Sequence, residues 1–252
     1  MNPQKDPTTT DTPRTQVAVL PERMVVRLLV VLAAATGSLD VVCVTRLGGP
    51  FASVVTGNLV QLGRGVAAPD GPLVVGVAAA VAGYALGVAA GTAGLGRSAT
   101  KWRRRTTLIA LTEVTLLAGF AAVWLATEGR PDANATIALL AVAGAAMGVQ
   151  SAITISSGVH DASTTYMTGT LTSVVRTLVA GPHRFVTTGG GAARLAALLC
   201  AATVGALLLR VTPLWASTLP VALVATVVGI AVQRTRRAAA RSRVEAGTRA
   251  RR

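Results

Sequence analysis

The residues that could do chemistry are few, and most of them fall in two short polar interruptions of an apolar chain. The first interruption holds the carboxylate of Asp40 and the triplet Thr56, Gly57 and Asn58. A carboxylate near a break in a membrane helix is costly and tends to face a partner or a cavity. Asp40 is therefore a candidate for proton coupling or cation contact. The alternative is a structural role, as a cap or in an ion pair with a nearby arginine.

The second interruption holds Gln150 and the triplet Thr168, Gly169 and Thr170, which carry no charge. Neutral donors and acceptors suit a small polar solute or a dehydrated ion. They would alternatively bond to backbone groups freed where a helix breaks. If each Thr-Gly pair starts a half-helix, its free amides and positive dipole end would attract an anion or polar group. The candidate substrate-binding residues are Asp40, Thr56, Gly57, Asn58, Gln150, Thr168, Gly169 and Thr170.

The remaining reactive residue types do not form a catalytic pattern. His160 stands beside Asp161, but this pair lacks the third ligand or the nucleophile that metal or covalent chemistry needs. Cys43 and Cys200 are far apart in apolar runs, where free cysteines usually act as small packing residues. The sequence therefore predicts no enzyme, no catalytic residue, no metal site and no cofactor.

The elements that must position these residues are transmembrane helices. The chain is 52% hydrophobic and 13% charged, which is outside the usual range of soluble domains. Apolar runs of about 18 or more residues predict an all-α membrane protein. Two shorter apolar stretches, 51–66 and 163–179, predict re-entrant or broken half-helices. The six predicted spans are 24–44, 72–93, 106–126, 135–155, 194–209 and 214–232.

The two interruptions are related by an internal repeat. Each triplet is followed at the same offset by an arginine, Arg64 or Arg176, and each comes after the first span of a three-helix half. An odd number of spans per half predicts inverted repeats, as in many transporters. We expect a disordered tail over 1–22, repeat one over 23–127, repeat two over 134–233, and a basic tail over 234–252.

Basic residues crowd two regions, Arg97–Arg105 and the chain after Gln233. The positive-inside rule then predicts a multi-pass protein of a bacterial cytoplasmic membrane with both termini in the cytoplasm. The expected partners are the bilayer, including anionic lipids, and an unknown small solute. Nucleic acid is not expected, because no aromatic residues interleave the basic clusters.

Two features inside the spans suggest helix packing. Glu113 lies within the third span, and we expect a structural ion pair with Arg27 or Arg194. Gly83, Gly87 and Gly91 repeat every four residues in the second span, which lets another helix approach closely. This stripe predicts close packing, and a homodimer could use it.

The motifs resemble those of the YoaK family of bacterial membrane proteins, also known as the DUF1275 family. The resemblance rests on Gly37-x-x-Asp40, Leu47-Gly48-Gly49-x-Phe51, and Thr56-Gly57-Asn58 followed by Leu62-Gly63. In the second half it rests on Gly148-x-Gln150 and on Thr165-Tyr166-x-Thr168-Gly169-Thr170-Leu171. It implies a six-span inner-membrane protein with no established substrate. Ser151 and Arg46 depart from the family pattern.

The leading functional hypothesis is a small secondary transporter or permease for a small polar or anionic solute. Its site would lie at the two Thr-Gly helix breaks, near the middle of the membrane. The alternative is a non-transporting membrane scaffold or sensor, in which the breaks are packing features.

Overall fold

The computed structural model describes residues 20–96, 101–159, 162–165, 167–181 and 185–249, and these residues form helices and connecting loops without strands. The tail expected to be disordered thus lies mostly outside the described residues, as do His160, Asp161 and His183. The α-helices are α1 (Glu22–Arg46), α2 (Val55–Ala67), α3 (Gly71–Leu95), α4 (Arg104–Ala126), α5 (Ala133–Ile155), α6 (Thr168–Ala180), α7 (Phe185–Val211) and α8 (Thr218–Arg249).

Six of the described helices are long and apolar enough to cross a membrane, namely α1, α3, α4, α5, α7 and α8. Each predicted span lies within one of them, except that the last begins in a short 3-10 helix, η2 (Pro213–Trp215). The two remaining helices, α2 and α6, have 13 residues each and lie where half-helices were predicted. The all-helical, six-span prediction is therefore confirmed.

Local chemistry explains where several helices begin. The side chain of Asp70 accepts a hydrogen bond from the Leu73 amide at the start of α3, at 3.2 Å. The side chain of Asp132 accepts one from the Ala135 amide at the start of α5, at 2.7 Å. Both contacts satisfy amides that have no partner within their own helix.

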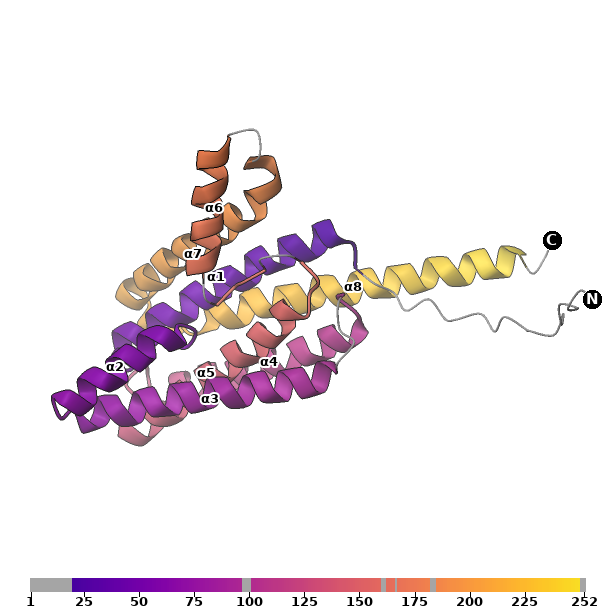
Figure 1. Cartoon of the computed structure of the whole chain (residues 1–252). Coiled ribbons are helices and arrows are strands. Elements are labelled where there is room, and N and C mark those ends of the chain that lie inside the picture. Colours follow the sequence, from indigo (N-terminus) through magenta and orange to yellow (C-terminus); the bar gives the residue numbers. More distant parts are fainter. Residues whose placement is uncertain (1–19, 97–100, 160–161, 166, 182–184, 250–252) are drawn as a thin grey trace, which may run out of the picture.

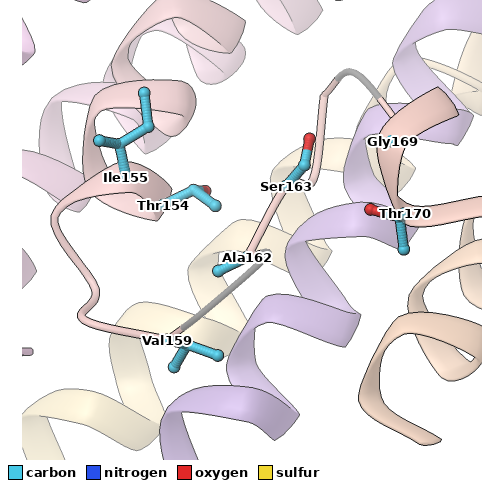
Figure 2. Close-up of a pocket in the computed structure, with 7 residues that line it drawn as sticks. All are labelled: Thr154, Ile155, Val159, Ala162, Ser163, Gly169 and Thr170. Carbon is cyan, nitrogen blue, oxygen red and sulfur yellow. The ribbon is translucent and has the colours of Figure 1, made fainter. Parts of the chain in front are cut away.

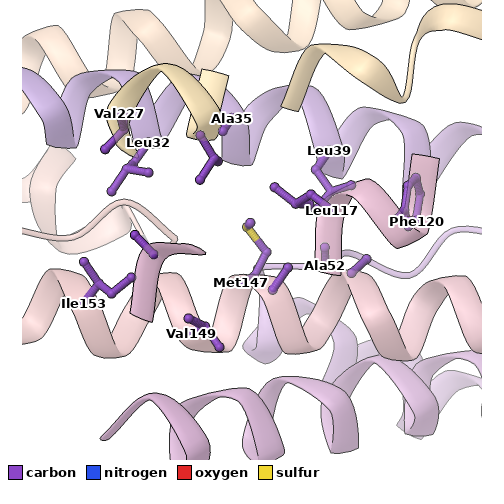
Figure 3. Close-up of a cluster of buried hydrophobic side chains, with 14 of the residues drawn as sticks. Leu32, Ala35, Leu39, Ala52, Leu117, Phe120, Met147, Val149, Ile153 and Val227 are labelled. Carbon is purple, nitrogen blue, oxygen red and sulfur yellow. The ribbon is translucent and has the colours of Figure 1, made fainter. Parts of the chain in front are cut away.

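Two helix pairs dominate the packing: α3 lies along α5, and α1 lies along α7 (Figure 1). α5 also packs against α4, and α1 also packs against α8. Apolar side chains from α1, α4, α5 and α8 meet in the core, including Leu32, Leu117, Met147 and Val227 (Figure 3). α2 packs against α3, and α6 packs against α7.

The glycine stripe of α3 faces α5. A Cβ atom at Gly83 or Gly87 would overlap the carbonyl of Ala141 or Ala145, and one at Gly148 of α5 would overlap the carbonyl of Tyr84. Backbone meets backbone here because no side chain intervenes. The stripe therefore packs against α5 of the same chain, and a homodimer of this protein stays a prediction.

Two helices extend beyond their predicted limits. α7 begins at Phe185, before the start of the predicted span at 194, and includes a glycine-rich stretch. A Cβ atom at Gly191 would lie 3.2 Å from a methyl group of Thr170, so the glycine allows α6 to approach α7. α8 continues to Arg249, through most of the basic tail, where alanine and arginine favour helix.

Candidate functional site

Asp40 anchors the loop that connects α1 to α2. Its Oδ1 atom accepts hydrogen bonds from the backbone amides of Ala52 and Ser53, at 2.8 and 3.0 Å. Its Oδ2 atom accepts a short hydrogen bond from the Ser53 hydroxyl. The carboxylate thus takes the place of a helix cap for amides that no helix satisfies.

Asn58 holds the same loop from the α2 side. Its amide nitrogen donates to the Phe51 carbonyl at 2.7 Å, and its side-chain oxygen accepts from the Phe51 amide at 2.8 Å. Gly49, two residues before Phe51, has a φ of +106°, a conformation that glycine adopts without strain. Asn58 is 1% exposed, so these two hydrogen bonds replace hydration that the loop backbone has lost.

Gln150 performs a related task in the second half. Its side-chain nitrogen lies 2.7 Å from the Thr36 hydroxyl of α1 and 2.9 Å from the Thr164 hydroxyl of the α5–α6 loop. Thr154 donates to the Gln150 carbonyl at 2.8 Å and also lies 3.0 Å from the Thr164 hydroxyl. Gln150 therefore ties α1, α5 and the second loop together.

A chain of hydrogen bonds connects the two loops. The Tyr84 hydroxyl of α3 donates to Ser151 at 2.7 Å, and Ser151 lies 2.7 Å from the Thr165 hydroxyl. The Thr165 carbonyl lies 3.2 Å from the Ser53 hydroxyl, which also reaches Asp40. We call these five residues, Tyr84, Ser151, Thr165, Ser53 and Asp40, the central polar network.

Ser53 is the branch point of this network. A hydroxyl carries one proton, so Ser53 can donate either to Asp40 or to the Thr165 carbonyl at a given moment. The first loop is therefore joined to the second through a group with two competing acceptors.

A cavity of about 270 Å³ adjoins the second loop (Figure 2). Its walls come from the end of α5, the following loop and the start of α6. Thr170 is 4% exposed, and its hydroxyl oxygen has no hydrogen-bond partner in the described part of the chain. The lining residues are Thr154, Ile155, Val159, Ala162, Ser163, Gly169 and Thr170.

The structure does not gather all the predicted site residues around one cavity. Gly169 and Thr170 line the cavity at the second loop, whereas Asp40, Asn58 and Gln150 bond to loop and helix groups beside it. Thr56, Gly57 and Thr168 have more exposed positions near the starts of the two short helices, outside the central polar network.

The expected ion pair of Glu113 is not formed. Glu113 is fully buried on α4, and both of its carboxylate oxygens lack a hydrogen-bond partner in the structure. α4 packs mainly on α5 and α8, whereas Arg27 lies on α1 and Arg194 on α7. The sequence placed the three residues at similar depth but could not show that their helices are not close neighbours.

Sequence reasoning missed Ser53 and Tyr84, and it noted Thr165 and Ser151 in the motifs without giving either residue a contact. A usable signal was present. Ser53 follows Asp40 by 13 residues, and Thr165 follows Ser151 by 14. The two contacts thus have similar spacings in the sequence, and Ser151 bonds to the loop although its residue type departs from the family pattern.

These features define a class of protein: a multi-pass helical membrane protein with two short helices whose preceding loops meet in a buried polar network. Residues 28–231 match the family described as a protein of unknown function, DUF1275, and the chain belongs to that family. Comparisons with curated proteins and with solved structures gave no match.

Proposed function

We propose that this protein is a small secondary transporter or permease for a small polar solute. The observation that carries the proposal is Thr170, which lines the cavity at the second loop and whose buried hydroxyl has no partner among the described residues. A buried hydroxyl without a partner is costly. A solute that hydrogen-bonds to it would remove that cost.

The pattern of helix contacts supports inverted repeats as part of this proposal. If the halves are equivalent, α1, α2, α3 and α4 correspond to α5, α6, α7 and α8. The contact between α3 and α5 then corresponds to the contact between α7 and α1. In the same way the pair α4–α5 corresponds to α8–α1, and the pair α2–α3 to α6–α7, and all of these pairs are in contact. On this plan α2 and α6 are re-entrant half-helices, and the site lies where their loops meet.

The residues around the cavity favour a neutral solute. The lining residues include the hydroxyl-bearing Thr154, Ser163 and Thr170, together with apolar groups, and none of these described residues is charged. Hydroxyl groups in a mostly apolar wall suit a small molecule with hydroxyl or amide groups. An anion would lack a cationic partner among them.

Asp40 and Ser53 offer a means of coupling in this proposal. Separation of the two loops would break the contact between Ser53 and the Thr165 carbonyl. The Ser53 hydroxyl would then donate its hydrogen bond to Asp40 alone. Asp40 would bind a proton or a cation more readily in one state than in the other, which is the requirement for coupling to a gradient.

A specific observation also favours the scaffold or sensor alternative. Asp40 and Asn58 form hydrogen bonds with the backbone of the first loop, as structural residues would. The cavity and the unpartnered Thr170 are what favour transport over this alternative.

Uptake into proteoliposomes tests the proposal, with a panel of neutral hydroxylated and amide solutes and small anions. Thr170→Val should raise the KM for the transported solute by about threefold to tenfold, the value of one hydrogen bond. The free energy of unfolding of this variant should not fall, because the Thr170 hydroxyl has no partner to lose among the described residues.

Thr172→Val is the matched control, since Thr172 lies on the same short helix, is exposed and bonds only to the Thr168 carbonyl of its own helix. It should leave uptake unchanged. Failure of the folded wild-type protein to take up any solute would favour a scaffold. Equal effects of the two variants would remove Thr170 from the site.

A further inference from the structure

A second cavity, of about 280 Å³, lies between the end of α1 and the end of α7. Two arginines, Arg46 and Arg210, line it together with the hydroxyl-bearing Thr45 and Thr203. No acidic side chain is among its described lining residues, which are completed by Ala206, Leu207 and Leu209. The cavity therefore combines positive charge with an apolar wall.

One of the arginines is held in place. A terminal nitrogen of Arg46 donates to the Leu209 carbonyl at 3.0 Å, which ties the end of α1 to α7. This hydrogen bond uses one of the five N–H groups of the guanidinium, so donors remain for a ligand. Both arginines are exposed, and neither is buried against the core.

The position of the cavity indicates that its ligand comes from the bilayer. α7 lies at the edge of the bundle, where its main described neighbours are α1, α6 and η2. Its outward residues Leu199, Val204, Leu207 and Val211 are between 46% and 78% exposed. In a membrane-spanning helix such a surface lies against acyl chains.

We propose that this cavity binds the headgroup of an anionic phospholipid. The phosphate would lie between Arg46 and Arg210, and the threonine hydroxyls would supply further hydrogen bonds. An acyl chain would follow the apolar face of α7. The proposal does not depend on transport.

Native mass spectrometry of the detergent-purified chain tests this site, with phosphatidylglycerol, phosphatidylcholine or inorganic phosphate added in turn. The wild-type protein should retain phosphatidylglycerol in preference to phosphatidylcholine. Each arginine near a membrane surface contributes about a fivefold factor in affinity. The double variant Arg46→Gln/Arg210→Gln should therefore bind phosphatidylglycerol about 25-fold more weakly.

The control is Arg64→Gln/Arg130→Gln, which removes two arginines that lie outside this cavity and should leave lipid binding unchanged. Arg210→Gln alone keeps the bond from Arg46 to Leu209, so it gives a fivefold test if the double variant is unstable. Equal retention of the two lipids by the wild type would overturn the proposal, as would unchanged binding by the variants. Displacement of phosphatidylglycerol by millimolar phosphate would assign the site to a soluble anion instead.

Discussion

At the scale of single residues, Asp40 and Asn58 do closely related work. Both replace missing helix hydrogen bonds for backbone groups of the loop between α1 and α2, and Asn58 does so while almost fully buried. The amide side chain suits this task because it donates and accepts at once, and it therefore satisfies both the amide and the carbonyl of Phe51.

Asn58→Ala should lower the free energy of unfolding by about 1–3 kcal/mol, because it leaves the partly buried amide and carbonyl of Phe51 without their side-chain partner. Thermal unfolding in detergent, followed by circular dichroism, would measure the loss. Gln61→Ala serves as the control, since it removes a single hydrogen bond, to the Gly49 carbonyl, from a residue that is less buried. Equal losses for the two variants would contradict the role assigned to Asn58.

At the scale of helices, close approach of backbones is the main device of this fold. Glycines on both members of the α3–α5 pair face the opposite backbone. In the α1–α7 pair, Gly37 faces the Leu198 backbone, whereas Gly205 faces the Val41 side chain, with the Ser38 backbone farther away. Without a hydrophobic driving force inside a bilayer, such close packing supplies much of the association between helices.

Gly87→Ala should destabilise the protein, because the added methyl group would overlap the Ala145 carbonyl and push α3 away from α5. A loss of about 1–3 kcal/mol is expected for overpacking of this kind. Gly119→Ala is the matched control, since no atom outside its own helix backbone lies within 4 Å of the new Cβ. It should be neutral or stabilising by up to about 1 kcal/mol, through helix propensity. Detergent-melting curves of the two variants would compare them, and a neutral Gly87→Ala would refute this account of the pair.

At the scale of the whole molecule, the bundle places the start of α1 and the end of α8 at the same end (Figure 1). The α3–α4 connection also lies there, because the Leu20 amide bonds to the Trp102 carbonyl at 3.2 Å. Arginine-rich segments therefore gather at one end of the bundle. The positive-inside rule predicts that this end lies in the cytoplasm.

Reporter fusions check this orientation. Green fluorescent protein fused after Arg252 should fluoresce, and alkaline phosphatase fused there should be inactive, because the C-terminus is expected in the cytoplasm. Alkaline phosphatase inserted near Arg130, in the α4–α5 connection, should be active. The reverse pattern at both positions would show that the protein has the opposite orientation.

The sequence predicted the six spans and both short helices because hydropathy and length limit what a membrane chain can form. It identified Asp40, Asn58 and Gln150 because polar residues are rare there. It did not give their partners, because the backbone of Phe51 has no side-chain pattern. The similar spacings of Asp40 from Ser53 and of Ser151 from Thr165 do not by themselves show which groups meet. The Glu113 pairing was wrong because which helices lie side by side depends on three-dimensional packing, which the order of spans does not specify.

The glycine contacts have a mechanical consequence. Helices α3 and α5 pack closely through their backbones at several glycines, and α1 meets the α7 backbone at Gly37. Each pair should therefore move as one stiff unit, and each unit contains one helix from either half of the sequence. Any opening of the central polar network would then be a tilt between these two units, with Ser53 and Thr165 at the joint.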